Sequence, residues 1–302
     1  MTLLPVRSDP EDGGPAWDPP RGGHLVPGHL AWEELAVGHH CQTWLCWSAE
    51  LWQPTLVKVV RPGWSRPRWT RALGREARAL RAVRHPAFPR LLGNGTRAPL
   101  PHLVLEFLDG PALDEVLDED GPLPDADVAR LGTALLSGLR GLHATGHAHL
   151  DICPDNVLLV DRRARLVDLG ASRPLGHVLR RGEEVGTDGF VAPELAAARG
   201  GAVTAAMDVY GVGATLRAVL EPGTGSLDDV LDALTAPDPA ARPTVDQALR
   251  LLVRRTGRGA ARSWPRWADR ELSGAAGVAP PRRARRTAGS AREHTERLAP
   301  AP

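Results

Sequence analysis

The stretch that most constrains this chain lies near its middle, in residues 149–159. An aspartate, a proline and an asparagine stand there at short fixed spacings, as Asp151, Pro154 and Asn156. The chain then runs directly into the apolar residues 157–159, which are typical of a buried strand. A polar loop at the start of such a strand suggests a functional site, and the surrounding elements determine which kind.

The length and composition fit one large domain or two lobes of a globular protein. The 302 residues are 42% hydrophobic and 24% charged, and the net charge of +1 gives no overall basic surface for nucleic acid. No apolar run reaches the roughly 18–20 residues of a membrane span, and residues 1–14 lack a signal core. The three cysteines predict no disulfide framework. We therefore expect a cytoplasmic protein with no nucleic-acid partner and no membrane span.

Both ends of the chain differ in composition from the middle. Residues 1–29 are dense in proline and glycine without periodicity, which predicts a flexible leader. Residues 256–302 are rich in arginine, alanine and proline, which predicts a disordered, solvated tail. Docking of its basic run 282–286 on an anionic partner is the alternative. Residues 30–255 are expected to form the folded domain.

The first part of this domain predicts strands and a single helix. Three short apolar runs, residues 32–37, 43–48 and 55–60, have the composition of strands, and a helix is expected at 66–83. The third run carries Lys58, the single lysine among 37 cationic side chains. Where arginine is the default cation, a lone lysine suggests a position that needs a compact ammonium group.

The later part of the domain predicts mainly helices. Residues 113–117 and 125–145 are expected to be helical, and the apolar side chains of the second recur at helical spacing. A strand–turn–strand element then leads to the tripeptide Asp168-Leu169-Gly170. This tripeptide carries no information alone, but it follows the polar loop of Asp151 at a defined spacing.

Taken together, these segments resemble protein kinases. Their signatures are the loop H-R-D-x-x-x-x-N, the strand V-A-I-K, the tripeptide D-F-G and the closing segment with A-P-E. The segments of this chain that resemble these four signatures are, respectively, residues 149–156, 56–60, 168–170 and 186–194. The resemblance covers about residues 30–253 and is to the bacterial, actinobacterial-like Hanks-type serine/threonine protein kinase family.

The resemblance implies a fold and two structural contacts. The fold is α+β and bilobal: an antiparallel sheet with one helix in residues 30–105, a hinge at 106–110 and a mainly helical lobe at 111–255. Asp208 would fasten the backbone of the catalytic loop, and Arg242 would pair with Glu194.

The resemblance also implies roles for individual residues. Asp151 would position a substrate hydroxyl and accept its proton with the help of Thr187, while Asn156 and Asp168 would bind Mg²⁺. Lys58, paired with Glu76, would contact the phosphates of ATP. The other nucleotide-binding residues implied are Val37, Gly38, Leu56, Leu105, Glu106 and Leu108. The implied partner is a protein that offers a serine or threonine hydroxyl, which includes the chain itself.

Several departures from the family pattern leave alternatives open. Residues 36–43 keep only one glycine of the glycine-rich loop, and Cys153 stands where these kinases carry a lysine, which predicts low activity. Leu150 replaces the arginine that responds to activation-loop phosphorylation, so gating of that kind is not expected. The alternatives are a pseudokinase, which is a nucleotide-binding scaffold with weak or no transfer, and a small-molecule phosphotransferase. Cys153 is either a redox brake, if its thiolate is accessible, or a passive side chain.

Overall fold

The computed structural model describes residues 4–9, 14–38, 40–63, 67–161, 163–180, 183, 185–197, 201–223, 225–255 and 286–287. Most of the predicted tail therefore lies outside the described residues. The chain divides into two compact units. The first contains the residues up to Arg81 together with Pro89–Leu108, and the second contains Ala82–Phe88 and the chain from Asp109 onward through the last helix.

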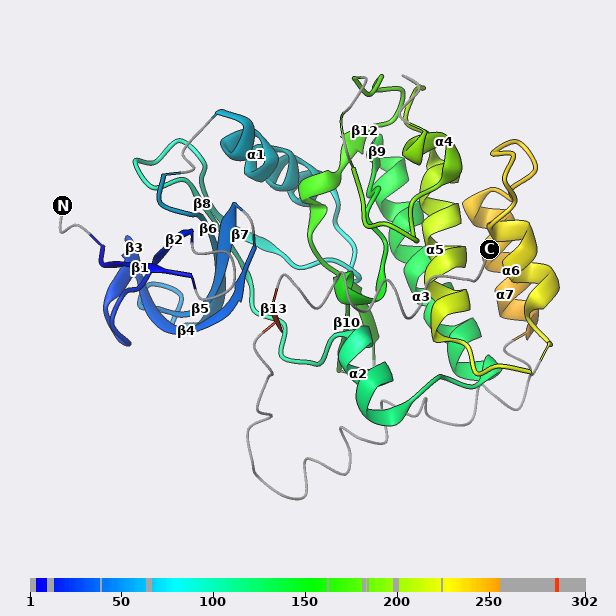
Figure 1. Cartoon of the computed structure of the whole chain (residues 1–302), viewed down its shortest axis with the longest axis horizontal. Coiled ribbons are helices and arrows are strands. Elements are labelled where there is room, and N and C mark those ends of the chain that lie inside the picture. Colours follow the sequence, from blue (N-terminus) through cyan, green and yellow to red (C-terminus); the bar gives the residue numbers. More distant parts are fainter. Residues whose placement is uncertain are drawn as a thin grey trace. The chain divides into compact units, whose positions relative to one another are not determined.

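The first unit is organised around an antiparallel sheet with the strand order β4-β5-β6-β8-β7 (Figure 1). The bounds are β4 His29–Val37, β5 Cys41–Ser48, β6 Gln53–Val60, β7 Leu91–Gly95 and β8 His102–Glu106. The three predicted strands are confirmed with slightly longer bounds, whereas β7 was not anticipated. The two-residue strand β13, Arg286–Thr287, pairs in parallel with β4.

The two faces of this sheet have different partners. Every second residue of β5 is buried, and the apolar ones join a core cluster with Val57 and Val59 of β6. Side chains alternate across a strand, so Lys58 points to the opposite face. Helix α1, Pro67–Ala82, packs on that side, as its contact with Lys58 shows. The helix predicted at 66–83 is thus confirmed.

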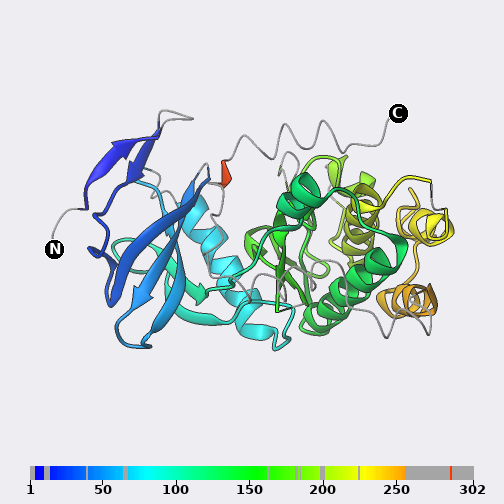
Figure 2. The same ribbon diagram turned by 90° about the horizontal axis from the view of Figure 1, so that it is seen from below.

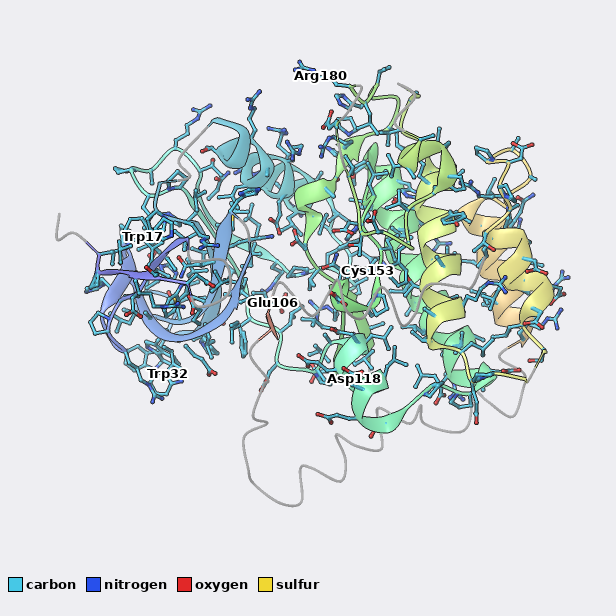
Figure 3. All side chains as sticks on the ribbon, viewed as in Figure 1. Trp17, Trp32, Glu106, Asp118, Cys153 and Arg180 are labelled. Carbon is cyan, nitrogen blue, oxygen red and sulfur yellow. The ribbon has the colours of Figure 1, made fainter. Side chains whose placement is uncertain are left out.

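The segment before residue 30 does not match the expectation of a flexible leader. Three short strands occupy it: β1 Val6–Ser8, β2 Pro15–Trp17 and β3 His24–Val26. β1 and β2 form an antiparallel hairpin, and β3 pairs with β4. Leu25 and Val26 belong to the core cluster, and Trp17 packs against it (Figure 3). The apolar outer face of the sheet requires cover, and strands of three residues are too short to show periodicity in the sequence.

The second unit is mainly helical, as predicted (Figure 2). Its α-helices are α2 Leu113–Asp120, α3 Asp125–Ala144, α4 Pro193–Ala196, α5 Ala205–Val219, α6 Asp228–Leu234 and α7 Val245–Arg255. Leu131, Leu135 and Leu139 of α3 are fully buried. A Cβ on Gly132 would lie 2.6 Å from the side chains of Leu216 and Leu252. Helices α3, α5 and α7 are therefore packed too closely for a larger residue at that position.

Short strands and 3₁₀ turns between α3 and α4 carry the polar loops. Their bounds are β9 His147–Ala148, η1 Pro154–Asn156, β10 Val157–Val160, β11 Arg163–Leu166, η2 Leu169–Ala171 and β12 Arg173–Pro174. β10 and β11 form the expected hairpin, in the register Val157 to Leu166. The sheet with its helix and the helical unit confirm the predicted kinase-like fold. Within the part of the chain that the structure describes, no helix combines the length and apolar character that crossing a bilayer requires.

Candidate active site

In the first unit, the lone lysine pairs with the glutamate that the resemblance indicated. Lys58 Nζ donates to Glu76 Oε2 at 3.0 Å, which joins β6 to α1. The Glu76 side chain is only 2% exposed and that of Lys58 is 14% exposed. Removing one partner of such an enclosed pair would take the bonded counter-charge away from a largely buried group, which is strongly unfavourable. The pair therefore fixes the ammonium group on the inner face of the sheet.

The other residues proposed for nucleotide binding lie on strands of the same unit or directly after them. Leu56 of β6 and Leu105 of β8 are register partners on adjacent strands, and Leu105 and Leu108 are buried. Glu106, labelled in Figure 3, ends β8. Its carboxylate accepts a hydrogen bond from the Arg90 backbone N–H at 3.0 Å. Val37 ends β4 and is followed by Gly38, whose N–H donates to Cys41 O at 2.9 Å.

In the second unit, three of the predicted polar residues lie together. Thr187 Oγ1 donates to Asp151 Oδ1 at 2.7 Å, and Asn156 Nδ2 donates to the Asp151 carbonyl at 3.0 Å. Gly186 allows this approach: its φ of +90° is left-handed, and a Cβ there would lie 2.7 Å from the Leu150 carbonyl oxygen. The loop and the segment that ends in A-P-E are thus joined at Asp151.

A buried aspartate from α5 fastens the loop, as the resemblance implied. Asp208 accepts hydrogen bonds from the backbone N–H of His149 at 2.8 Å and of Leu150 at 2.7 Å. It also accepts one from His143 Nε2 at 2.7 Å. Burial opposes ionisation of this carboxyl, but these donors hold the pKa of Asp208 below its usual value. They also fix Leu150 in a left-handed conformation, φ 69°, which is costly for a leucine.

The second predicted contact lies at the end of the segment 186–194, which carries A-P-E. Arg242 Nη1 and Nη2 donate to Glu194 Oε1 and Oε2, both at 2.7 Å. The Arg242 side chain is fully buried in this bidentate pair, and it also donates to the carbonyl oxygens of Ala206 and Ala236. The predicted ion pair is confirmed, and it joins α4 to the loop before α7.

The carboxyl of Asp151 has an unusual electrostatic environment. Burial raises its pKa, repulsion from Asp168 adds to the shift, and the hydrogen bond from Thr187 opposes it. Asp168 follows β11 with a left-handed φ of 60°, and its Oδ1 accepts a hydrogen bond from Gly170 N at 3.1 Å. Two carboxylates that repel one another would be stabilised by a cation, so the donor set fits Mg²⁺.

The described residues do not supply a complete metal site. Among them, no group of three or more His, Cys, Asp or Glu side chains is placed to hold a metal ion. Asn156 uses its amide nitrogen on the Asp151 carbonyl, so its amide oxygen is the atom that would contact a cation. A Mg²⁺ ion held by Asn156 and Asp168 would take its remaining ligands from phosphate oxygens and water, which is common for this ion.

The structure contradicts the proposal that Cys153 is a redox brake. Cys153, which is labelled in Figure 3, is only 2% exposed. Burial, with repulsion from Asp151 and Asp155, raises the pKa of the Cys153 thiol well above its usual value. The thiolate that oxidation requires is therefore disfavoured, and the passive small side chain is the better description.

Alkylation of the native protein at pH 7.5 is expected to separate the three cysteines. Cys153 is buried as described, and burial raises the pKa of the buried Cys46 to about 12. Cys41 is partly exposed, so iodoacetamide should modify Cys41 first and leave the other two nearly unmodified. Peptide mass spectrometry measures the modified fractions, and denatured protein is the control in which all three react. Modification of Cys153 at the rate of Cys41 would contradict its burial.

Sequence reasoning missed an ion pair between β12 and the loop that follows it. Arg173 is buried and donates to Glu183 Oε1 from Nε at 3.2 Å and from Nη2 at 2.5 Å. Glu183 Oε2 also accepts from Arg180 N at 3.3 Å. Partial burial opposes ionisation, but the contacts with Arg173 and Arg180 lower the pKa of Glu183. No sequence pattern pairs these residues, because their contact depends on how the loop folds.

Replacing Glu183 by glutamine is expected to lower the free energy of unfolding by about 1–3 kcal/mol at pH 7, since a charge-assisted hydrogen bond is lost beside a buried guanidinium. The pKa of Glu183 is lower in the folded state, so the effect should be complete above the usual value of 4.5 and should shrink as the pH falls through the folded-state pKa. Urea unfolding at several pH values measures this. The control is Asp229→Asn in an exposed pair with Arg255, and an equal, pH-independent effect of both variants would contradict the prediction.

Comparison with known proteins agrees with this geometry. The protein kinase domain family model matches residues 32–225. Serine/threonine-protein kinase PkaA of Streptomyces coelicolor is 34% identical over 191 residues, which are 60% of this chain and 35% of that protein. PknB of Mycobacterium leprae is 28% identical over 206 residues, 65% of this chain and 33% of that protein. For the probable kinase PkwA of Thermomonospora curvata the identity is 29% over 209 residues, 67% of this chain and 28% of that protein.

The matched part spans about a third of the length of these curated relatives. It contains the sheet with Lys58 and Glu76, and the loops that carry Asp151, Asn156 and Asp168. The match covers well over half of this chain. The chain therefore belongs to the protein kinase family, among the bacterial Hanks-type serine/threonine kinases.

Proposed function

We propose that this chain is an ATP- and Mg²⁺-dependent serine/threonine protein kinase. The observation that carries the proposal is the hydrogen bond from Thr187 to the Asp151 carboxylate, with Asn156 donating to the backbone carbonyl of the same residue. This arrangement fixes the orientation of the Asp151 carboxylate, and a purely structural role would not require that orientation. We further propose that the kinase acts in the cytoplasm and that its acceptor is a protein hydroxyl, including hydroxyls of this chain.

In the proposed reaction, Asp151 orients the acceptor hydroxyl and takes up its proton. Thr187 occupies Oδ1, so Oδ2 is the oxygen that accepts the proton. The hydroxyl oxygen forms a bond to the γ-phosphorus, the bond from that phosphorus to the bridging oxygen breaks, and ADP leaves with the electron pair. The raised pKa of Asp151 makes its carboxylate a better proton acceptor than an ordinary aspartate.

Other residues bind ATP in this proposal. Lys58, held by Glu76, places its ammonium group on the phosphates, and Asn156 and Asp168 hold Mg²⁺. When bound, Mg²⁺ neutralises negative charge on the phosphate oxygens. The apolar side chains of Val37, Leu56 and Leu105 contact the adenine, and the backbone at Gly38, Glu106 and Leu108 contacts the nucleotide. Catalysis then consists mainly of positioning and charge neutralisation.

A pseudokinase is the second candidate, and Cys153 favours it. The buried, uncharged thiol supplies no cation to the transferring phosphoryl group. Loss of one electrostatic donor costs about 3–4 kcal/mol of transition-state stabilisation in other enzymes. Such a protein would bind ATP and partners without transferring phosphate at a useful rate.

Incubation of the full chain with γ-labelled ATP and Mg²⁺ distinguishes the two candidates. A kinase is expected to place label on its own serine or threonine residues or on added casein, and mass spectrometry identifies the modified residues. EDTA and the variant Lys58→Met should both abolish the signal. Thermal stabilisation by ATP without transfer would instead support the pseudokinase. The absence of both stabilisation and transfer would contradict both candidates.

A further inference from the structure

A buried arginine joins the N-terminal hairpin to the turn between β4 and β5. Arg61 follows β6 and is only 2% exposed. Its Nε donates to the Pro15 carbonyl of β2 at 3.0 Å, and its Nη1 donates to the Gly38 carbonyl at 3.1 Å. Its backbone N–H donates to the carbonyl of His40 at 2.9 Å. Arg61 therefore contacts the hairpin through its side chain, and it contacts the turn through both its side chain and its backbone.

A second set of contacts holds the strand that leaves the turn. Gln42 of β5 is fully buried, its Oε1 accepts from Trp17 N at 2.7 Å, and its Nε2 donates to Trp17 O at 2.9 Å. The indole Nε1 of Trp17 donates to the Val60 carbonyl at 2.8 Å. Arg7 of β1 forms an ion pair with Glu34 of β4. The hairpin is thus bonded to β4, β5 and β6 around one end of the sheet.

These contacts restrict a turn whose sequence departs from the family. Residues 38–41 keep one glycine, and the turn is closed by the hydrogen bond from Gly38 N to Cys41 O. Loss of either carbonyl acceptor would leave a buried N–H group of the Arg61 guanidinium without that hydrogen bond, at substantial cost. The carbonyl of Gly38 is therefore fixed relative to Pro15. Pre-organising a binding segment improves affinity because less freedom is lost when the ligand binds.

We propose that the hairpin of β1 and β2, together with Arg61, is a brace that fixes the turn at residues 38–41 for ATP binding. Arg61 is then a positioning residue, since it acts through the turn rather than on the nucleotide. The hairpin precedes the residues that the family model matches, so the comparison does not assign it a role. The inference rests on the proposed function, because it concerns the nucleotide site of that function.

The variant Arg61→Gln tests the brace, with Arg21→Gln as the matched control. Arg21 lies in the same unit, and its guanidinium carbon lies 3.7 Å from the centroid of the Trp32 ring. We expect Arg61→Gln to raise the dissociation constant of ATP and the KM for ATP about tenfold, the equivalent of one lost charged hydrogen bond. The kcat and the KM for the protein substrate should change less than about twofold. The control should match the parent chain in every constant.

Hydrogen exchange in the nucleotide-free protein separates this inference from the proposed function. The backbone amides of residues 38–42 should exchange faster in Arg61→Gln and not in Arg21→Gln. If the parent chain binds no ATP, the proposed function fails. Faster amide exchange in Arg61→Gln would still demonstrate that Arg61 restrains the turn. Unchanged exchange and unchanged ATP affinity, even with a lower Tm, would overturn the brace. If Arg61→Gln does not fold, Arg61→Lys serves, because it keeps the charge but cannot span both carbonyls.

Discussion

Replacing Asp151 by asparagine is expected to lower the rate of phosphoryl transfer about 10²–10⁴-fold, the usual contribution of a positioned general base. The amide oxygen of asparagine can still accept the hydrogen bond from Thr187, so the loop should keep its conformation. The amide cannot take up a proton from the acceptor hydroxyl at any ordinary pH. The loss should therefore appear in kcat, while the dissociation constant of ATP changes little.

The measurement is steady-state transfer from γ-labelled ATP, with ATP binding measured separately by calorimetry. Asp155→Asn is the control, because Asp155 lies in the same loop and has no proposed part in proton transfer. Its rate should stay within a few-fold of the parent chain. Equal transfer by the parent chain and Asp151→Asn would show that another group accepts the proton, or that the label comes from a contaminating kinase.

Replacing Asp208 by alanine is expected to reduce the free energy of unfolding by about 3–5 kcal/mol, the range for breaking a buried charged network. Three donors lose their acceptor: the backbone N–H groups of His149 and Leu150, and His143 Nε2. The Leu150 backbone would also lose the contact that holds its left-handed φ. The variant should thus lose transfer activity even at temperatures where it remains folded.

Urea unfolding measures this effect, and an exposed aspartate provides the comparison. The Asp232 side chain is 73% exposed in its pair with Arg217, so Asp232→Ala should change the free energy of unfolding by less than about 1 kcal/mol. Asp208→Asn keeps one acceptor oxygen, so its loss of unfolding free energy should lie between those of Asp208→Ala and Asp232→Ala. A loss below about 1 kcal/mol for Asp208→Ala would mean that water replaces the carboxylate, contrary to its complete burial.

Much of the fold and site was predictable from local pattern. The strand that carries Lys58 and the helix that carries Glu76 were predicted from sequence pattern, and their pairing, which the structure contains, was implied by the family resemblance. The contacts of Asp208 and Arg242 followed from the family resemblance. In each case the residues lie on regular elements or in loops of fixed length, so sequence spacing determines direction in space.

Other features could not be predicted, for physical reasons. The strands β1 to β3 are three residues each, and they form because the sheet behind them needs an apolar cover, which no local pattern reveals. The burial of Cys153 depends on the whole helical unit. The pair of Arg173 and Glu183 joins two points of an irregular loop. Such contacts depend on tertiary packing rather than on propensity.

The apolar cover on the outer face of the sheet has a practical consequence for anyone who expresses this protein. A fragment that starts at residue 32, where similarity to other kinases begins, would lack Trp17, Leu25 and Val26. The apolar surface around Trp44, Val57 and Val59 would then be exposed to solvent, and the fragments would associate with one another through this surface. Weak activity in such a truncated preparation would report self-association rather than the chemistry of the enzyme.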